Sequence, residues 1–191
     1  TPRRARVVVR DRVLHRLDGR LFGQFLERAS FGEPGPEPFA DPVTGRLPAA
    51  VVAKLREMRI PIVRFPGGTD ADYIDWRDMV SGVPGRGPER PVTLGHRGQP
   101  ITNRFGLDEY FALRDELGCQ TILVANFRDA VARKVPLAEA AMRAAGLVAY
   151  CNAPVGAKLP PGMDDWPALR ARNGREKPFR AEFIQIGNEW W

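Results

Sequence analysis

Cysteine and histidine are scarce in this sequence. Its 191 residues include two cysteines, Cys119 and Cys151, and two histidines, His15 and His96. The cysteines lie too far apart for a CxxC redox or zinc pair, and so few ligands exclude a His/Cys metal site. We therefore expect no metal and no cofactor, and both cysteines as buried free thiols. A disulfide between them is the less favoured alternative, and the cysteine content does not decide the compartment.

Long hydrophobic runs are absent as well. No stretch of about 18 apolar residues could span a membrane. The N-terminal TPRRARVVVR offers no apolar stretch of signal-peptide length. The sequence therefore predicts no membrane partner and no visible targeting segment, and a cytoplasmic and a secreted location both stay open. A Gly-Lys-Ser/Thr phosphate loop and a GxSxG nucleophile elbow are also missing.

Lysine is rare among the basic residues. Only four of the 29 Lys and Arg residues are lysine, and the formal net charge is +6. The arginines are scattered among acids, except for one cluster formed by Arg3, Arg4, Arg6, Arg10 and Arg12. A charged, exposed strand edge explains this cluster better than a phosphate-binding arm does. We therefore predict no nucleic-acid partner. A steep salt dependence of nucleic-acid binding would support the alternative.

Glycine and proline are plentiful and gather in loops. There are 19 Gly and 18 Pro, concentrated in residues 32–38, 81–100 and 154–167. Between these loops, short apolar strands alternate with amphipathic helices. The predicted strands are 5–14, 21–27, 61–65, 121–125 and 183–186. The predicted helices are 48–59, 107–117 and 136–150. Such alternation is typical of βαβ units, so we predict an α/β fold with a parallel sheet.

Polar residues follow the apolar strands. In parallel α/β folds the carboxyl ends of the strands carry the functional site. Those ends are Gln24–Glu27, Arg64–Asp70, Asn126 and Asn188–Glu189. Polar groups bunched at one edge of a buried sheet predict a site there.

Glu189 is the strongest candidate for chemistry. It follows the apolar strand 183–186 and precedes Trp190 and Trp191. An apolar setting disfavours the charged form of a carboxyl group and so suits a general acid, and indole rings offer flat faces for sugar rings. On the strand pattern alone, a Glu simply exposed at a chain end is equally compatible.

Glu27 and Arg64 are the next candidates. Glu27 could be a second carboxyl group, an acceptor for hydroxyl groups or a partner of Arg28. Arg64 lies inside an apolar strand, which indicates that it points to the mouth and pairs with a carboxylate. An ordinary structural ion pair is the alternative for Arg64.

The turn after the 61–65 strand has several readings. Gly67 and Gly68 would allow close approach of a ligand to the backbone, or would simply form a tight turn. Asp70 and Asp72 follow, and each could be a helix cap or a functional acid.

Six segments together resemble glycoside hydrolase family 51, the α-L-arabinofuranosidases. In the order of the family, they are 23–28 (GQFLER), 55–68 (LREMRIPIVRFPGG), 72–78 (DYIDWRD), 103–110 (NRFGLDEY), 150–156 (YCNAPVG) and 187–189 (GNE). The resemblance implies that residues 17–191 are the N-terminal half of a (β/α)8 TIM barrel, strands 1 to 4. Residues 1–16 would contribute a preceding strand to a β-sandwich domain.

The resemblance also implies roles for single residues. Glu189, at the end of strand 4, would be the general acid/base, and Asn188 would bond the sugar 2-hydroxyl. Glu27 would accept from sugar hydroxyls, and Arg64 would hold the carboxylates in place. The implied substrate-binding set is Glu27, Arg64, Gly68, Thr69, Trp76 and Asn188. Thr69 departs from the family, which usually has Asn there, so the exact sugar is open.

The length is the larger departure from the family. A (β/α)8 barrel alone takes about 250 residues, and the nucleophile of this clan lies on strand 7. We therefore expect the N-terminal portion of a retaining enzyme that releases terminal α-L-arabinofuranosyl residues from plant-type polysaccharides. The portion alone would be inactive, and its partners would be the carbohydrate, the remainder of the same enzyme chain and, as an option, a second copy.

Two other classes of function remain as alternatives. One is another retaining glycosidase of the same clan, such as an endo-glucanase, a xylanase or a β-xylosidase, which Thr69 keeps open. The other is a non-catalytic module, either a degenerate barrel that binds glycans or a basic domain that binds nucleic acid.

Overall fold

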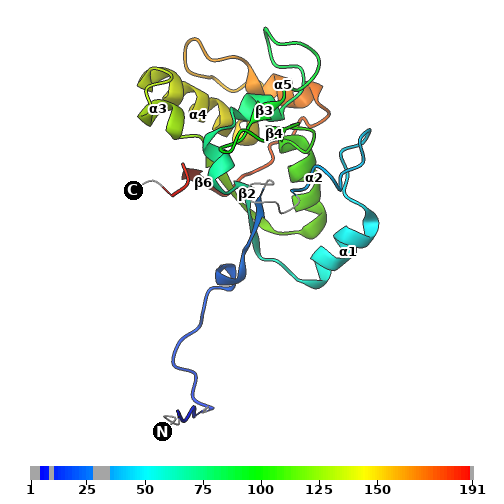
Figure 1. Ribbon diagram of the computed structural model, residues 1–191, viewed down its shortest axis with the longest axis vertical. Coiled ribbons are helices and arrows are strands. Elements are labelled where there is room, and N and C mark those ends of the chain that lie inside the picture. The colour runs from blue at the N-terminus through cyan, green and yellow to red at the C-terminus, as the bar shows by residue number, and fades with distance from the viewer. Residues whose placement is uncertain (1–4, 9–10, 28–34, 190–191) are drawn as a thin grey trace.

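The centre of the molecule is a parallel sheet of four strands. The computed structural model describes residues 5–8, 11–27 and 35–189. The strand order is β1-β2-β5-β6. Figure 1 shows the chain with β2 and β6 of this sheet labelled. The strands are β1 (Gln24–Glu27), β2 (Ile62–Gly67), β5 (Gln120–Ala125) and β6 (Phe183–Ile186). The predicted α/β class with a parallel sheet is therefore confirmed.

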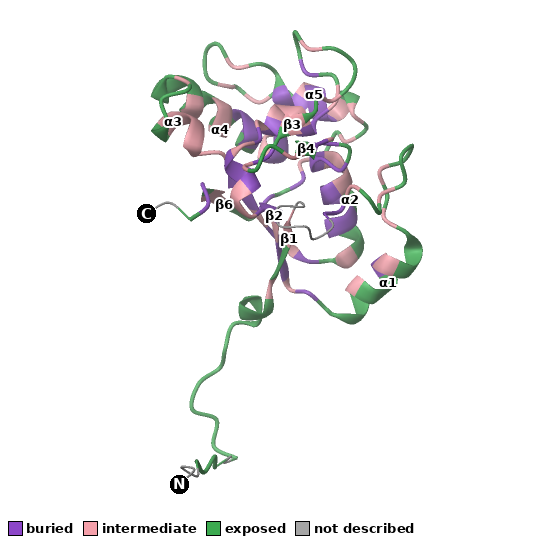
Figure 2. Ribbon diagram, viewed as in Figure 1, coloured by how far each residue is buried: buried purple, intermediate pink, exposed green. Residues whose placement is uncertain are grey.

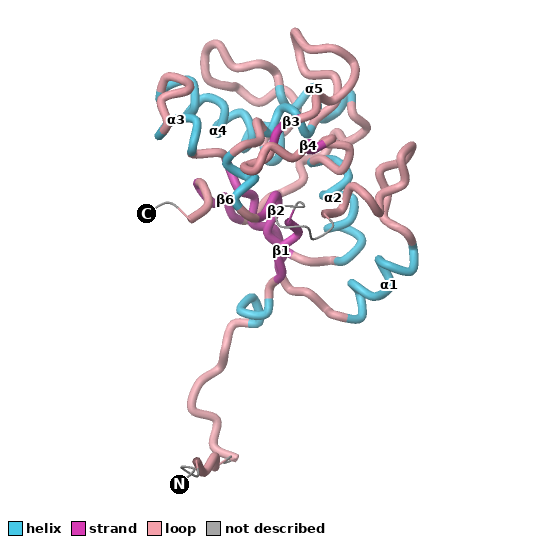
Figure 3. Tube along the Cα trace, viewed as in Figure 1, coloured by secondary structure: helices cyan, strands magenta, loops and turns pink. Residues whose placement is uncertain are grey.

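Helices connect these strands along the chain. The longer ones are α1 (Ala49–Glu57) before β2, α2 (Leu107–Leu117) before β5 and α4 (Leu137–Asn152) before β6. Short helices and one hairpin fill the connections: η1 (Gly19–Phe22), η2 (Thr69–Asp72), η3 (Trp76–Met79), β3 (Thr93–Leu94), β4 (Pro100–Ile101), α3 (Arg128–Val131) and α5 (Trp166–Arg172) (Figure 3). Within the described residues, no helix is both long enough and apolar enough to cross a membrane.

The core lies between the sheet and α2. Phe65 of β2 is fully buried and stacks on Tyr110 of α2, with the ring centroids 4.4 Å apart. The Tyr110 hydroxyl donates to the Val63 carbonyl at 3.1 Å and lies 2.8 Å from the Thr121 hydroxyl of β5. A buried hydroxyl needs such partners, so these bonds fix α2 across two neighbouring strands.

The opposite face of the sheet is open. The register places Phe25, Arg64, Ile122 and Phe183 side by side across the four strands. Phe25 is 65% exposed and Phe183 is 40% exposed, whereas Phe65 on the helix-covered face has no exposure. Large aromatic rings are normally covered in a folded enzyme. The described residues thus form a sheet that is packed on one side only.

The N-terminal segment differs from its prediction. A strand was expected at 5–14, but the described part of that range forms no strand and is exposed, in a tail that runs away from the sheet (Figures 2 and 3). The strand expected at 21–27 begins only at Gln24, because η1 precedes it. Asp18 caps η1 by accepting from the Arg20 amide at 2.9 Å. A strand needs a neighbour for its hydrogen bonds, and the described residues supply none to the tail.

Both cysteines are free and buried, as predicted. Burial raises the pKa of the Cys119 and Cys151 thiols above the ordinary value, so little thiolate forms near neutral pH. We expect iodoacetamide to leave both thiols unmodified in the native protein and to alkylate both in denaturant, as read from the intact mass. Rapid labelling of Cys151 without denaturant would contradict this.

Candidate active site

Three predicted site residues meet at the carboxyl edge of the sheet. Glu27 ends β1, Arg64 lies in β2, and Asn188 follows β6. The Arg64 guanidinium donates from Nη2 to Oε1 of Glu27 at 3.1 Å and from Nη1 to Oδ1 of Asn188 at 3.2 Å. One planar cation therefore connects the first strand to the last across the mouth of the sheet.

The Arg64 guanidinium has a partner over its flat face as well as partners for its N–H groups. Its guanidinium carbon lies 3.9 Å from the centroid of the Phe25 ring, which is a cation–π contact. The side chain of Arg64 is 13% exposed and that of Glu27 is 32% exposed. The pair is thus partly desolvated, but Glu27 keeps an open side from which a ligand could reach its carboxylate.

Two glycines at the end of β2, Gly67 and Gly68, make room for Glu27. A Cβ atom at Gly67 would lie 2.5 Å from Cγ of Glu27, and one at Gly68 would lie 3.0 Å from its Oε2. Gly68 also has a φ of 66°, which L side chains rarely adopt. Thr69 follows as the first residue of η2 and is half-buried. The turn is therefore tight, as one of the two interpretations predicts, and it brings backbone close to the Glu27 carboxylate.

Glu189 lies at the mouth itself and is exposed. It has a φ of 52°, and Gly187 two residues earlier has a φ of 67°. The Gly187 amide continues the strand pairing by donating to the Ala125 carbonyl at 2.9 Å. The predicted aromatic setting of Glu189 depended on Trp190 and Trp191, which lie outside the described residues.

Two buried carboxylates, Asp70 and Asp72, lie in η2. The sequence left open whether each is a helix cap or a functional acid. Asp72 accepts from the Asn188 amide at 2.7 Å and from the Phe127 amide at 2.7 Å. Asp70 accepts from the His96 amide at 2.7 Å and lies 3.0 Å from its Nδ1. Their position directly after a strand end was the signal in the sequence, but it did not say which amides they bind.

Comparison with known proteins identifies the family of this site. The family model for the alpha-L-arabinofuranosidase 1 domain matches residues 54–191, a range that includes Arg64, Asn188 and Glu189. The chain belongs to this α-L-arabinofuranosidase family. The resemblance seen in the six sequence segments is therefore confirmed.

Curated and solved members of the α-L-arabinofuranosidase family align along most of this chain. Alpha-L-arabinofuranosidase C of Emericella nidulans is 30% identical over 191 residues, covering 95% of this chain and 33% of the relative. The intracellular exo-alpha-(1->5)-L-arabinofuranosidase of Streptomyces lividans is 33% identical over 179 residues, covering 89% and 24%. The crystal structure of the GH51 arabinofuranosidase from Xanthomonas axonopodis pv. citri superposes with a TM-score of 0.68 at 30% identity, covering 91% and 32%. The chain thus spans about a quarter to a third of the length of these relatives.

One residue of the substrate-binding set implied by the resemblance lies apart from the cluster at the mouth of this α-L-arabinofuranosidase fold. Trp76 is buried, donates from its indole to the Arg143 carbonyl at 2.7 Å and packs edge-on against Trp166 at 4.8 Å. The structure therefore places Trp76 in the core below the site and does not bring it to Glu27, Arg64 and Asn188. Asn126 bonds the Ile74 carbonyl at 3.2 Å and so ties β5 to the same layer.

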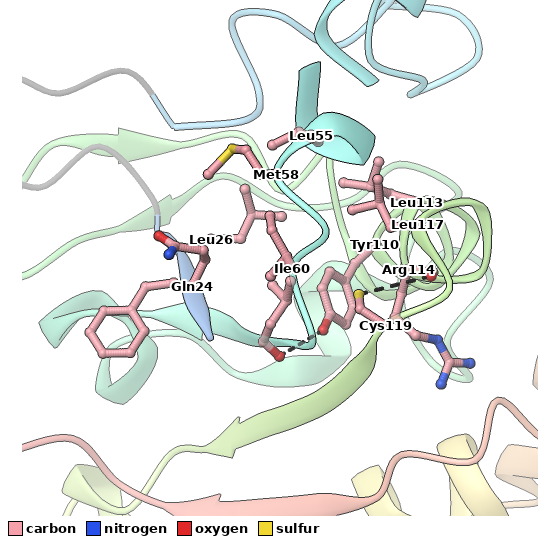
Figure 4. A pocket seen from close by; sticks show the side chains of 12 residues that line it. Gln24, Leu26, Leu55, Met58, Ile60, Tyr110, Leu113, Arg114, Leu117 and Cys119 are labelled. Carbon is pink, nitrogen blue, oxygen red and sulfur yellow. Dashed lines mark hydrogen bonds between the residues drawn. The ribbon is translucent and has the colours of Figure 1, made fainter. Parts of the chain in front are cut away.

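A separate cavity lies beside β1, on the side of α1 and α2. It has a volume of about 170 Å³ and opens between β1, α1 and α2 (Figure 4). Its lining is mostly apolar: Gln24, Phe25, Leu26, Leu55, Met58, Ile60, Val63, Tyr110, Leu113, Arg114, Leu117 and Cys119. Sugar sites need several converging polar groups. The cluster at the carboxyl edge meets that need better than this cavity does.

Proposed function

We propose that this chain is the first part of a retaining α-L-arabinofuranosidase. The observation that carries the proposal is the Arg64 bridge, which joins Glu27 and Asn188 at the carboxyl edge of a parallel sheet, with Glu189 next in sequence. In (β/α)8 enzymes that edge carries the chemistry. The names of the relatives along this chain support the same activity.

Each residue at the mouth has a proposed task. Retaining hydrolysis uses two carboxyl groups about 5–5.5 Å apart, one of which protonates the leaving oxygen and later activates water. Glu189 takes this acid/base task because it is an exposed carboxyl group beyond the last strand. Asn188 bonds the sugar 2-hydroxyl and Glu27 accepts from other hydroxyls, while Arg64 fixes both.

The turn after β2 completes the proposed sugar site. Gly68 brings backbone close to the carboxylate of Glu27, and the half-buried Thr69 offers a hydroxyl beside it. The second carboxylate, the nucleophile, is proposed to lie in the remainder of the enzyme.

The remainder of the same chain is the proposed partner of the open sheet face. Residues 17–191 would be strands 1 to 4 of a (β/α)8 barrel, and residues 1–16 would supply a strand to a β-sandwich. The exposed rings of Phe25 and Phe183 support this proposal, since a closed barrel buries its inner face. The threefold to fourfold greater length of the relatives supports it too.

A substrate panel tests the proposed activity. The complete enzyme is assayed on nitrophenyl α-L-arabinofuranoside, β-xyloside and β-glucoside, with residues 1–191 assayed in parallel. We expect arabinofuranoside to be hydrolysed by the complete enzyme at least 10²-fold faster than the others, since a site built around one sugar's hydroxyls rejects analogues strongly. Preference for xyloside or glucoside would instead assign another activity of the same clan. Full activity of residues 1–191 alone would refute the proposal that the nucleophile lies in the remainder of the enzyme.

A further inference from the structure

The η2 turn presents two buried carboxylates that point to different parts of the molecule. Asp70 has no exposed surface, and Asp72 is 2% exposed. Asp70 binds the turn of the β3–β4 hairpin, through the His96 amide and the Gln99 side-chain amide at 2.8 Å. Asp72 points toward the strand ends instead. One short turn therefore serves two separate contacts.

Asp72 fastens two strand ends to the turn that follows β2. Its Oδ1 accepts from the Phe127 amide at 2.7 Å and from the Arg128 amide at 3.3 Å, just beyond β5. Its Oδ2 accepts from the Asn188 amide at 2.7 Å, just beyond β6. Charge-assisted bonds of this length to backbone amides are strong and directional. The carboxylate thus sets where β5 and β6 end relative to β2.

Asn188 is consequently held through both its backbone and its side chain. Asp72 binds its backbone amide at 2.7 Å, and Arg64 binds its side-chain oxygen at 3.2 Å. The residues on either side, Gly187 and Glu189, both have positive φ values, 67° and 52°. A non-glycine residue keeps that conformation only where its surroundings enforce it. The clamp on Asn188 supplies this constraint to Glu189.

We infer that Asp72 is a positioning residue that aims the carboxyl group of Glu189 at the leaving-group oxygen. The inference rests on the proposed acid/base role of Glu189. Asp72 acts through the Asn188 backbone and does not itself contact the sugar. Its loss would let the 187–189 segment relax, so that the acid stands in the wrong place while the sugar hydroxyls are still bound by Glu27.

Leaving-group dependence separates this role from a merely structural one. A misplaced acid slows substrates whose phenol leaves poorly, but hardly affects those whose phenol leaves without protonation. In the complete enzyme, we expect Asp72→Asn and Asp72→Ala to lower kcat/KM on phenyl α-L-arabinofuranoside about tenfold, because kcat/KM reports the step in which the phenol leaves and small misplacements of a catalytic group have large effects. kcat/KM on the dinitrophenyl substrate should change less than about twofold, since that phenol leaves without protonation and the sugar is still bound.

Asp70→Asn is the matched control. It removes an equally buried carboxylate from the same turn, but one that binds the hairpin and not Asn188. Melting temperatures are recorded for all variants. We expect Asp70→Asn to lower the melting temperature as much as Asp72→Asn does and to leave the ratio of the two rates as in wild type.

Each outcome decides the matter. A tenfold change in the rate ratio for Asp72→Asn, absent in Asp70→Asn, supports the inference. Equal losses on both substrates, or Asp72 variants that do not fold, would assign Asp72 to the fold and overturn it. If Glu189→Gln shows no leaving-group dependence, the proposed function fails first. If the rate of Glu189→Gln depends on the leaving group and that of Asp72→Asn does not, the proposed function stands and only the positioning role of Asp72 fails.

Discussion

Replacing Glu189 with alanine is expected to lower kcat/KM of the complete enzyme on phenyl α-L-arabinofuranoside by about 10²–10⁴-fold, the range that general acid–base catalysis contributes. The carboxyl group of Glu189 would protonate the departing oxygen, and alanine cannot. The loss should shrink as the phenol becomes a better leaving group, because the bond then breaks without a proton. Initial rates across a series of aryl arabinofuranosides give the dependence.

Azide provides a second reading of the same variant. Without the carboxylate, water is no longer activated in the second step, but azide needs no base and can attack the glycosyl-enzyme directly. Added azide should therefore restore turnover of dinitrophenyl arabinofuranoside by Glu189→Ala and yield a glycosyl azide. Glu57→Ala is the control, because Glu57 is a solvent-exposed partner of Lys54 on α1. Wild-type rates in Glu189→Ala on poor leaving groups would refute the assignment.

Replacing Arg64 with leucine is expected to lower kcat/KM by about 10²-fold, because both Glu27 and Asn188 lose the group that orients them. The unfolding free energy should fall by about 1–3 kcal/mol, since a partly buried carboxylate and amide oxygen lose their donor. Arg64→Lys should recover little activity. A lysine ammonium is a point charge and cannot match the planar fork that spans Glu27 and Asn188.

Kinetics and urea unfolding on the same preparations measure the two effects. Arg56→Leu is the matched control, because Arg56 makes a surface pair with Glu116 at 3.0 Å and both side chains are largely exposed. Exposed pairs contribute about 0–1 kcal/mol, so this variant should retain both activity and stability. Unchanged kcat/KM in Arg64→Leu would remove Arg64 from the proposed site.

Some elements of the fold could be predicted to the residue. The helix at 107–117 and the strand at 183–186 agree with the sequence interpretation, because each has a clear apolar period and a stop signal. Helix α5 and the β3–β4 hairpin were missed. Seven residues and two pairs of residues are too short to show a period, and α5 depends on a local cap in which Asp165 accepts from the Ala168 amide at 3.0 Å.

Burial on α1 was also harder to predict than the helix itself. Val51, Leu55 and Met58 lie at i, i+4 and i+7, a spacing that predicts one common apolar face. In the structure Val52 is the buried residue and Met58 is exposed. Which side of a short helix faces the sheet depends on how the connections place it, and those connections are loops that carry no periodic signal.

The candidate site was predictable where chemistry and strand position coincide. An arginine in an apolar strand predicted the ion pair with a carboxylate at the mouth, and the structure places Glu27 there. Asp72 could not be assigned in this way. The amides that it binds lie 55 and 116 residues further along the chain, so its role exists only after three strands have come together.

The strand order has a consequence for how the protein is made. Strands β1, β2, β5 and β6 follow one another in space as they do along the chain. As synthesis proceeds from the N-terminus, each strand can therefore pair with the one before it as soon as it leaves the ribosome. The growing edge is β6, where Ile186 is exposed. While β6 is the outer strand, the nascent chain carries an unpaired apolar edge, and chaperones would be needed most at this stage.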